Sequence, residues 1–176
     1  MERRFAIKQI LIMAGGIALL PSCLKESGKS SILLKNLTVT LDQELLLGEI
    51  AETIIPKTDT PGAKELNLHL FVLKMLDDCY EPEKQRDFLK GLEQLQQETQ
   101  NQFAKSFSKL TLMEREEVLR KIENNKEASP ELAVFYQLMK NKTIQGYVSS
   151  KYVMTNLKKW ELVPGRYNGY FPVKSA

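Results

Sequence analysis

The spacing of apolar residues restricts the possible folds of this chain more than any other feature. From about Asp42 onward, apolar side chains recur every three or four residues. No segment alternates apolar and polar residues for long, and the longest β-branched run is a short one around Thr38. A repeat of three to four residues lines one face of an α-helix, whereas a half-buried strand needs a repeat of two. The sequence therefore predicts an all-α fold, a bundle of about five or six helices.

Capping residues and prolines mark where these helices begin. The marks are the capping pairs Thr40–Gln43 and Thr111–Glu114, the first-turn proline Pro82, and Ser129-Pro130-Glu131. The predicted apolar faces are Leu47, Ile50, Ala51, Ile54 and Ile55; Leu68, Phe71, Val72, Met75, Leu76 and Cys79; Phe88, Leu92 and Leu95; Val118, Leu119 and Ile122; and Leu132, Phe135, Tyr136 and Met139. Cys79 is thus predicted to be a buried thiol. The neighbouring pair Asp77-Asp78 is interpreted as solvated surface.

The first 23 residues have the three parts of an export signal. A basic start with Arg3-Arg4 precedes an apolar stretch, residues 10–20, and then Leu20-Pro21-Ser22-Cys23. The apolar stretch is about half of the ~20 residues that a membrane-spanning helix needs. The Arg3-Arg4 pair resembles a twin-arginine signal, which exports folded cargo, although the ordinary secretory route remains open.

The residues that end the leader look like a bacterial lipobox. On this interpretation Cys23 is acylated and anchors an exported protein to the membrane on the periplasmic side. The alternative is general signal-peptidase cleavage, with Cys23 an ordinary or disulfide-bonded residue. The predicted organisation is a signal peptide over residues 1–23, a polar tether over 24–36, and one helical domain over 37–176. Its end, residues 163–172, is irregular and aromatic, and is predicted to pack as a strap on this domain or on a partner.

The residue inventory excludes several classes of function. The chain has two cysteines and one histidine, and it contains no CxxC, CxxCH or HExxH pattern. Zinc-finger, c-type haem and zincin sites are therefore excluded. No GxGxxG or P-loop pattern is present to hold a dinucleotide or triphosphate. The formal net charge is +3, and most of the surplus lies before Cys23, so nucleic acid is not expected as a partner.

The segment Ile54 to Ala63 (IIPKTDTPGA) is the most distinctive stretch of the sequence. Two prolines, a glycine and short polar residues between two helices predict a rigid loop. Such a loop is either a well-made turn or a recognition surface, which a stiff backbone presents at little ordering cost. A catalytic Asp59 is the least favoured reading, since no base, metal set or second carboxylate stands beside it. His69 is read as a packed residue rather than a ligand.

Together these segments resemble the gluconate 2-dehydrogenase subunit 3 family. The resemblance rests on IIPKTDTPGA, on Phe88 to Leu92 (FLKGL), on Thr143 to Tyr147 (TIQGY) and on Val163 to Tyr167 (VPGRY), in family order. It implies a small, non-catalytic subunit that escorts a large FAD-containing subunit, with a multihaem cytochrome c subunit taking the electrons. FAD and haem are then expected on partner chains and no cofactor on this one.

The expected partner-binding residues lie in three of these segments. They are Pro56, Thr58, Asp59, Thr60, Pro61 and Gly62; Gly146 and Tyr147; and Pro164, Gly165 and Tyr167. The competing hypothesis is a free-standing helical envelope lipoprotein that binds a ligand or scaffolds an assembly. An enzyme that uses Asp59 or His69 is the weakest hypothesis.

Overall fold

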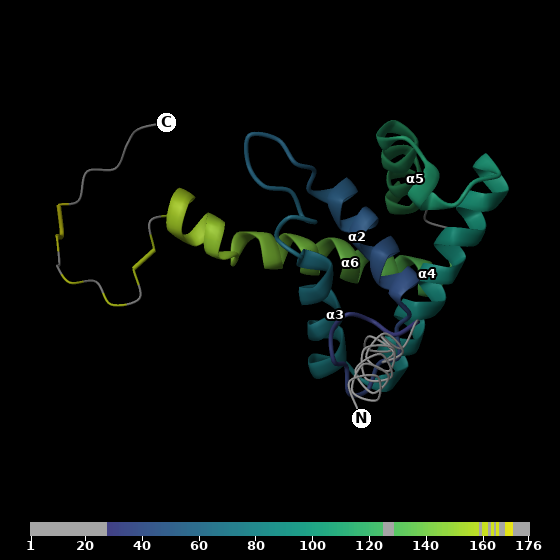
Figure 1. Ribbon diagram of the computed structural model, residues 1–176, viewed down its shortest axis with the longest axis horizontal. Helices are drawn as coiled ribbons and strands as arrows, with labels where there is room; N and C mark the ends of the chain where they lie inside the picture. Colours follow the sequence, from purple (N-terminus) through teal and green to yellow (C-terminus); the bar gives the residue numbers. More distant parts are fainter. Residues whose placement is uncertain are drawn as a thin grey trace, which may run out of the picture.

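The computed structural model describes residues 28–124, 129–158, 160, 161, 163, 165 and 168–170. Within them the chain forms α2 (Leu41–Ile54), α3 (Leu68–Cys79), α4 (Pro82–Phe103), α5 (Leu112–Asn124) and α6 (Pro130–Val148), with a 3-10 turn η1 (Phe107–Lys109) and a π turn η2 (Val153–Leu157). The described residues contain no strand, only an isolated bridge between Lys29 and Thr40. The predicted all-α bundle is confirmed (Figure 1).

The predicted helix starts are observed as hydrogen bonds. The hydroxyl of Thr40 accepts the amide of Gln43, and the Gln43 side chain accepts the amide of Thr40. Thr111 and Glu114 form the same reciprocal pair at the start of α5. At α6 the side chain of Ser129 accepts the amide three residues on.

None of the described helices is long and apolar enough to cross a membrane. The predicted export signal, with Arg3, Arg4 and Cys23, lies outside the described residues.

The core is organised around α6, which packs against α2, α3, α4 and α5. The rings of Phe88 on α4 and Phe135 on α6 lie 4.9 Å apart between centroids, and both side chains are fully buried. Gly91 marks a close approach of these two helices. A Cβ atom at this position would lie 2.4 Å from the carbonyl oxygen of Glu131 and 2.4 Å from Cβ of Phe135.

Two predictions for α3 are wrong. Cys79 is exposed, and the carboxylate of Asp77 is buried. The buried face of α3 comprises Leu68, Val72, Leu73, Leu76 and Asp77. This face is rotated from the predicted stripe because Asp77 has partners from another part of the chain. Its carboxylate accepts the backbone amides of residues 35, 36 and 37, at 2.8, 2.7 and 2.9 Å.

Asp77 and Glu44 together form what we call the N-terminal clamp. The carboxylate of Glu44 accepts both the amide and the hydroxyl of Ser31, each at 2.6 Å. The carbonyl oxygen of Gly28 accepts the amide of Leu41 at 3.1 Å, beside the first turn of α2. From residue 28 onward, the predicted tether is therefore hydrogen-bonded to the helices, and the folded domain begins before residue 37.

Candidate interaction surface

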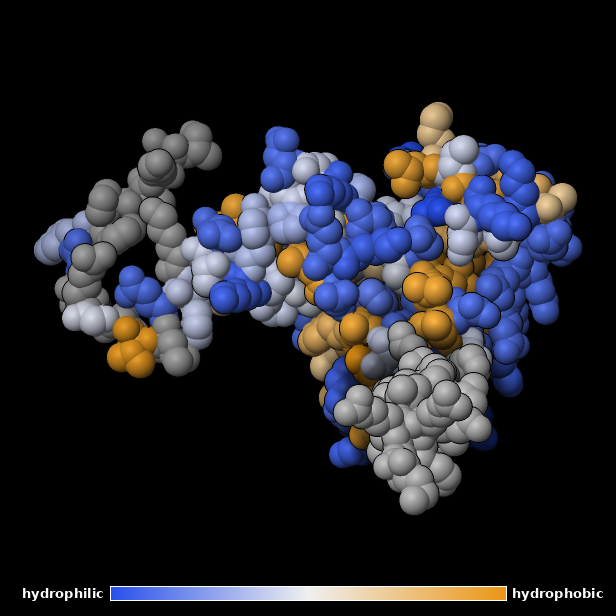
Figure 2. Space-filling model, viewed as in Figure 1, coloured by the Kyte–Doolittle hydropathy of each residue, from blue (hydrophilic) through white to orange (hydrophobic). Residues whose placement is uncertain are grey.

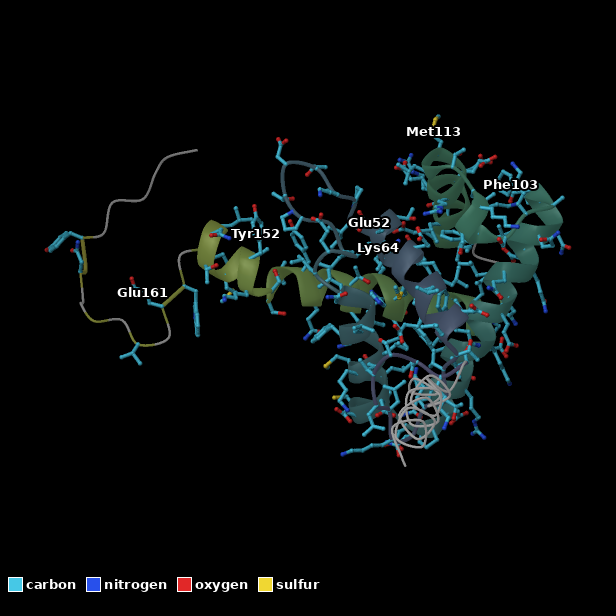
Figure 3. The ribbon with its side chains drawn as sticks, in the orientation of Figure 1. Glu52, Lys64, Phe103, Met113, Tyr152 and Glu161 are labelled. Atoms are coloured by element: carbon cyan, nitrogen blue, oxygen red, sulfur yellow. The ribbon has the colours of Figure 1, made fainter. Side chains whose placement is uncertain are left out.

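The loop over residues 55–63, between α2 and α3, is closed at its base. The amide of Ala63 donates to the carbonyl oxygen of Ile55 at 2.9 Å. The carboxylate of Glu52 accepts the amide of Lys57 with one oxygen, at 3.0 Å, and the amide of Lys64 with the other, at 2.8 Å. Glu52 and Lys64 lie together where the loop leaves the helices (Figure 3). A single carboxylate thus joins both arms of the loop.

The glycine of the PGA segment makes this closure possible. Gly62 is buried, and a Cβ atom there would lie 2.5 and 2.7 Å from the two oxygens of Glu52 and 2.7 Å from the amide nitrogen of Lys57. Any other residue would displace the carboxylate from between the two arms. Gly62, expected at a partner interface, therefore has a structural role in shaping the loop.

The tip of the loop presents side chains to solvent on an ordered backbone. The amide of Thr58 donates to the carbonyl oxygen of Thr60 at 3.1 Å. Pro56, Thr58 and Asp59 are exposed, whereas Thr60 and Pro61 are partly buried. Exposed residues on a backbone that is already ordered lose little entropy on binding. The tip is therefore an ordered segment whose side chains are accessible to solvent.

The second predicted segment meets this loop through α6. The hydroxyl of Tyr147 donates to Oγ1 of Thr60 at 3.1 Å, although the two residues are 87 positions apart. Beside it, Gly146 is buried, and a Cβ atom there would lie 2.8 Å from Cδ1 of Phe71. The glycine lets α6 approach α3 closely enough for Tyr147 to reach the loop. Two of the three expected partner-binding segments are therefore in direct contact.

The third segment does not join this surface within the described residues. Pro164 and Tyr167 lie outside them, and Gly165 is exposed with no heavy atom near its would-be Cβ. The exposed fractions of Trp160 and Tyr170 are 52% and 97%. These aromatic side chains follow α6 and η2, which project beyond the other helices (Figure 1).

Two acidic residues of α2 that the sequence did not single out support the base of the loop. Glu49 pairs with Lys64 and with Arg115, each at 2.6 Å, and Arg115 also donates to the carbonyl oxygen of Ser108 at 2.7 Å. Burial raises the pKa of Glu49, but the hydrogen bonds from Lys64 and Arg115 outweigh it and lower the pKa overall. Glu49 is thus a carboxylate at neutral pH. No sequence signal identifies Glu49 or Glu52, because their partners are set by how the helices pack.

A small groove continues the surface along α2, α5 and α6. Its volume is about 320 Å³, and its lining includes Ile54, Pro56, Leu119, Arg120, Tyr136 and Lys140. The lining combines apolar side chains with charges of both signs, because Glu116 lies beside the two basic residues. In the space-filling view, the face that bears these helices is mostly hydrophilic, with a few apolar patches among the polar side chains (Figure 2). The volume of the groove is at the lower end of the roughly 300–1,000 Å³ that is typical of ligand pockets.

Within the described part of the chain, neither Asp59 nor His69 belongs to a cluster of metal-ligand side chains. Among the described residues, no group of three His, Cys, Asp or Glu side chains could hold a metal ion. His69 is partly buried, with its ring about 3.7 Å from a would-be Cβ of Gly48. Burial lowers the pKa of His69, so the ring is neutral at pH 7. The arrangement is that of a packed residue.

Removing the Glu52 carboxylate is expected to loosen the loop. In Glu52→Ala the amides of Lys57 and Lys64 lose a charged acceptor, and we expect a loss of about 1–2 kcal/mol in stability. The same amides should exchange hydrogen faster. The control is Glu65→Ala, which removes only the exposed ion pair with Lys57 and should cost less than about 0.5 kcal/mol. Unchanged exchange in Glu52→Ala would contradict the role of this carboxylate.

A comparison with models of known protein families gave a match. A family model described as gluconate 2-dehydrogenase subunit 3 matches residues 41–165, well over half of the chain. The match runs from the start of α2 to the described Gly165, and so includes the loop and Tyr147. A comparison with curated proteins found no match, and neither did a comparison with solved structures.

Proposed function

The chain belongs to the gluconate 2-dehydrogenase subunit 3 family, and we propose that it is a non-catalytic accessory subunit of a membrane-bound, FAD-dependent oxidoreductase complex. In this proposal it aids the export, assembly or anchoring of a large flavoprotein subunit. FAD resides on that subunit and haem on a cytochrome c subunit. This chain supplies binding surface and an attachment to the membrane.

The observation that carries the proposal is the contact between Tyr147 and Thr60, at 3.1 Å. It joins the loop 55–63 to α6 and makes a preformed surface from two segments that are distant in sequence. Ile144 and Val148 stand one turn apart on the same helix, each with 42% of its surface exposed. Exposed apolar side chains on a helix that contacts an ordered loop are typical of a protein–protein interface.

The leader supports the location that we propose. The Arg3-Arg4 pair fits twin-arginine export, which carries folded cargo, so a flavoprotein that has folded around FAD could cross the membrane together with this chain. The lipobox-like end supports acylation of Cys23 and attachment on the periplasmic side.

In the proposed subunit, the Asp59 side chain contributes to recognition of the partner rather than to catalysis.

The test is a pull-down of the full chain from its native cells in mild detergent. We expect the eluate to contain a large oxidoreductase subunit and to show flavin absorbance. Asp59→Arg reverses a charge at the exposed loop tip and should reduce the co-purified flavin at least about tenfold, the factor for a loss of 1.4 kcal/mol. The control is Glu98→Arg, the same reversal at an exposed position on α4.

A colourless, solitary chain would contradict the subunit proposal. It would favour the second candidate, a free-standing envelope lipoprotein that binds or scaffolds another component. Equal flavin recovery from Asp59→Arg and wild type would keep the complex but remove the loop tip from its interface.

A further inference from the structure

The N-terminal clamp has a consequence for how an anchored domain is oriented. We propose that the clamped end of the domain, formed by residues 31–38, faces the lipid surface and that the loop 55–63 faces away from it. This inference rests on the acylation of Cys23, which is part of the proposed function. It adds a lipid-facing surface that is distinct from the surface proposed for the partner.

The clamp shortens the flexible part of the chain between the lipid anchor and the domain. Residues 28–30 are paired with residues 39–41 at the start of α2, through Ser30 to Val39 and Leu41 to Gly28 hydrogen bonds of 3.1 Å. Farther along, Asp77 binds three consecutive backbone amides and Glu44 binds Ser31. Residues 28–37 therefore cannot act as a spacer.

Only residues 24–27 separate Cys23 from Gly28. At 3.3–3.6 Å per residue, the five steps between these two residues span at most about 18 Å. By the same measure, a free tether over 24–36 would let the fourteen steps from Cys23 to Leu37 span up to about 50 Å. The domain therefore begins within a short distance of its lipid anchor, and the range of its orientations is restricted.

The clamp and the loop lie at opposite ends of α3. The helix begins at Leu68, a few residues after the loop closes at Ala63, and its buried Asp77 lies in its last turn. Its 12 residues make α3 about 18 Å long, at 1.5 Å per residue. In Figure 1 the N-terminal segment, in purple, passes the lower end of α3, and the loop lies above its upper end.

The clamped end carries side chains that suit a lipid headgroup region. Leu33 has 87% of its surface exposed, the second-highest value among the large apolar residues described, and Lys35, two residues farther along the chain, is also exposed. An exposed leucine near a lysine in the chain can place its apolar part among lipid chains while the ammonium group remains with the headgroups. A lipid surface gives Leu33 an apolar environment that the domain itself does not provide.

The experiment places a fluorescent reporter at each end of the domain. Trp160 is the single tryptophan of the chain, so Trp160→Phe gives a silent background. In that background Leu33→Trp reports on the clamped end and Met113→Trp on the opposite end, where Met113 is 83% exposed (Figure 3). The lipidated protein is inserted into phosphatidylcholine vesicles with brominated acyl chains. We expect quenching to be several-fold stronger at position 33.

Two further variants separate the possible causes of that result. A Gly/Ser spacer of about ten residues between residues 27 and 28 should weaken quenching at position 33, because it lengthens the flexible part of the chain. Leu33→Trp combined with Cys23→Ser should show no quenching, which excludes insertion driven by the tryptophan alone. Equal quenching at positions 33 and 113 in an acylated protein would overturn the orientation and leave the anchor standing.

Mass spectrometry of the N-terminal peptide tests separately whether Cys23 is acylated. An unmodified Cys23 would overturn the anchor and the orientation together. The pull-down of the flavoprotein does not depend on either result, so the subunit proposal stands or falls by its own test.

Discussion

Substituting alanine for Gly91 is expected to destabilise the domain by about 3 kcal/mol, the upper part of the usual range for an overpacked core. The added methyl group would lie 2.4 Å from the carbonyl oxygen of Glu131 and 2.4 Å from Cβ of Phe135. Neither atom belongs to the flexible end of a side chain, so α4 and α6 must move apart. That movement would also weaken the contact between the rings of Phe88 and Phe135.

Gly48→Ala is the matched control for this prediction. The three heavy atoms nearest to the same methyl group in α2 would belong to the ring of His69, at 3.7–3.8 Å, which is an ordinary contact distance. Alanine at this helical position should raise stability by up to about 1 kcal/mol through its better helix propensity. Urea unfolding followed by far-UV circular dichroism measures both variants. Effects of the same sign and size would contradict a close crossing of α4 and α6 at Gly91.

The helices could be predicted from the sequence because their determinants are local. Thr40 and Gln43, or Thr111 and Glu114, satisfy each other across a single turn, and the pattern is visible as two letters three residues apart. The apolar repeat likewise needs no knowledge of the neighbours. The close contact at Gly91 could not be predicted in this way. A glycine inside a helix only lowers the helix propensity of the segment, and its packing role appears once the neighbouring helix is known.

The errors in α3 show where local reasoning ends. Residue types ranked by how often they are buried in proteins would place Cys79 in the core and Asp77 on the surface. The opposite holds, because Asp77 binds backbone amides about forty residues earlier in the chain. Burying a carboxylate is favourable only when donors surround it, and these donors come from a segment that the sequence suggested was a tether. A tertiary contact therefore decided which side of the helix faces inward.

The candidate surface was predictable in part. The loop could be recognised by its prolines, its glycine and the family resemblance, which also singled out Tyr147. Its closure by Glu52 and its contact with Tyr147 could not, because both depend on how α2, α3 and α6 are placed. Gly62 illustrates the difference: it belongs to the distinctive segment, yet its role is to leave room for a carboxylate.

Asp77→Asn is expected to lower the free energy of unfolding by about 3 kcal/mol, since hydrogen bonds to charged groups and unsatisfied buried donors are each worth about 1–3 kcal/mol. Asparagine offers one oxygen where the carboxylate offers two, and its amide group would face backbone donors. The residue is 2% exposed, so water cannot replace the lost acceptor. The control is Asp78→Asn, next in the chain. Its exposed carboxylate pairs with Lys74, and the change should cost less than about 0.5 kcal/mol.

The pH dependence of this effect tests whether the charge of Asp77 is responsible. Burial raises the pKa of Asp77, but three backbone amides outweigh this effect and hold the pKa below its ordinary value. A lowered pKa means that the carboxylate stabilises the domain fully above its unfolded pKa, about 3.9, and loses this contribution as the pH falls through the folded value.

The difference in unfolding free energy between wild type and Asp77→Asn should therefore be constant from about pH 7 to pH 5. This gap should narrow at lower pH, because only the wild type gains a proton at position 77. Urea unfolding at each pH measures the gap. If the gap stays as wide well below the ordinary pKa as at neutral pH, hydrogen-bond geometry alone, and not the charge, would account for the clamp.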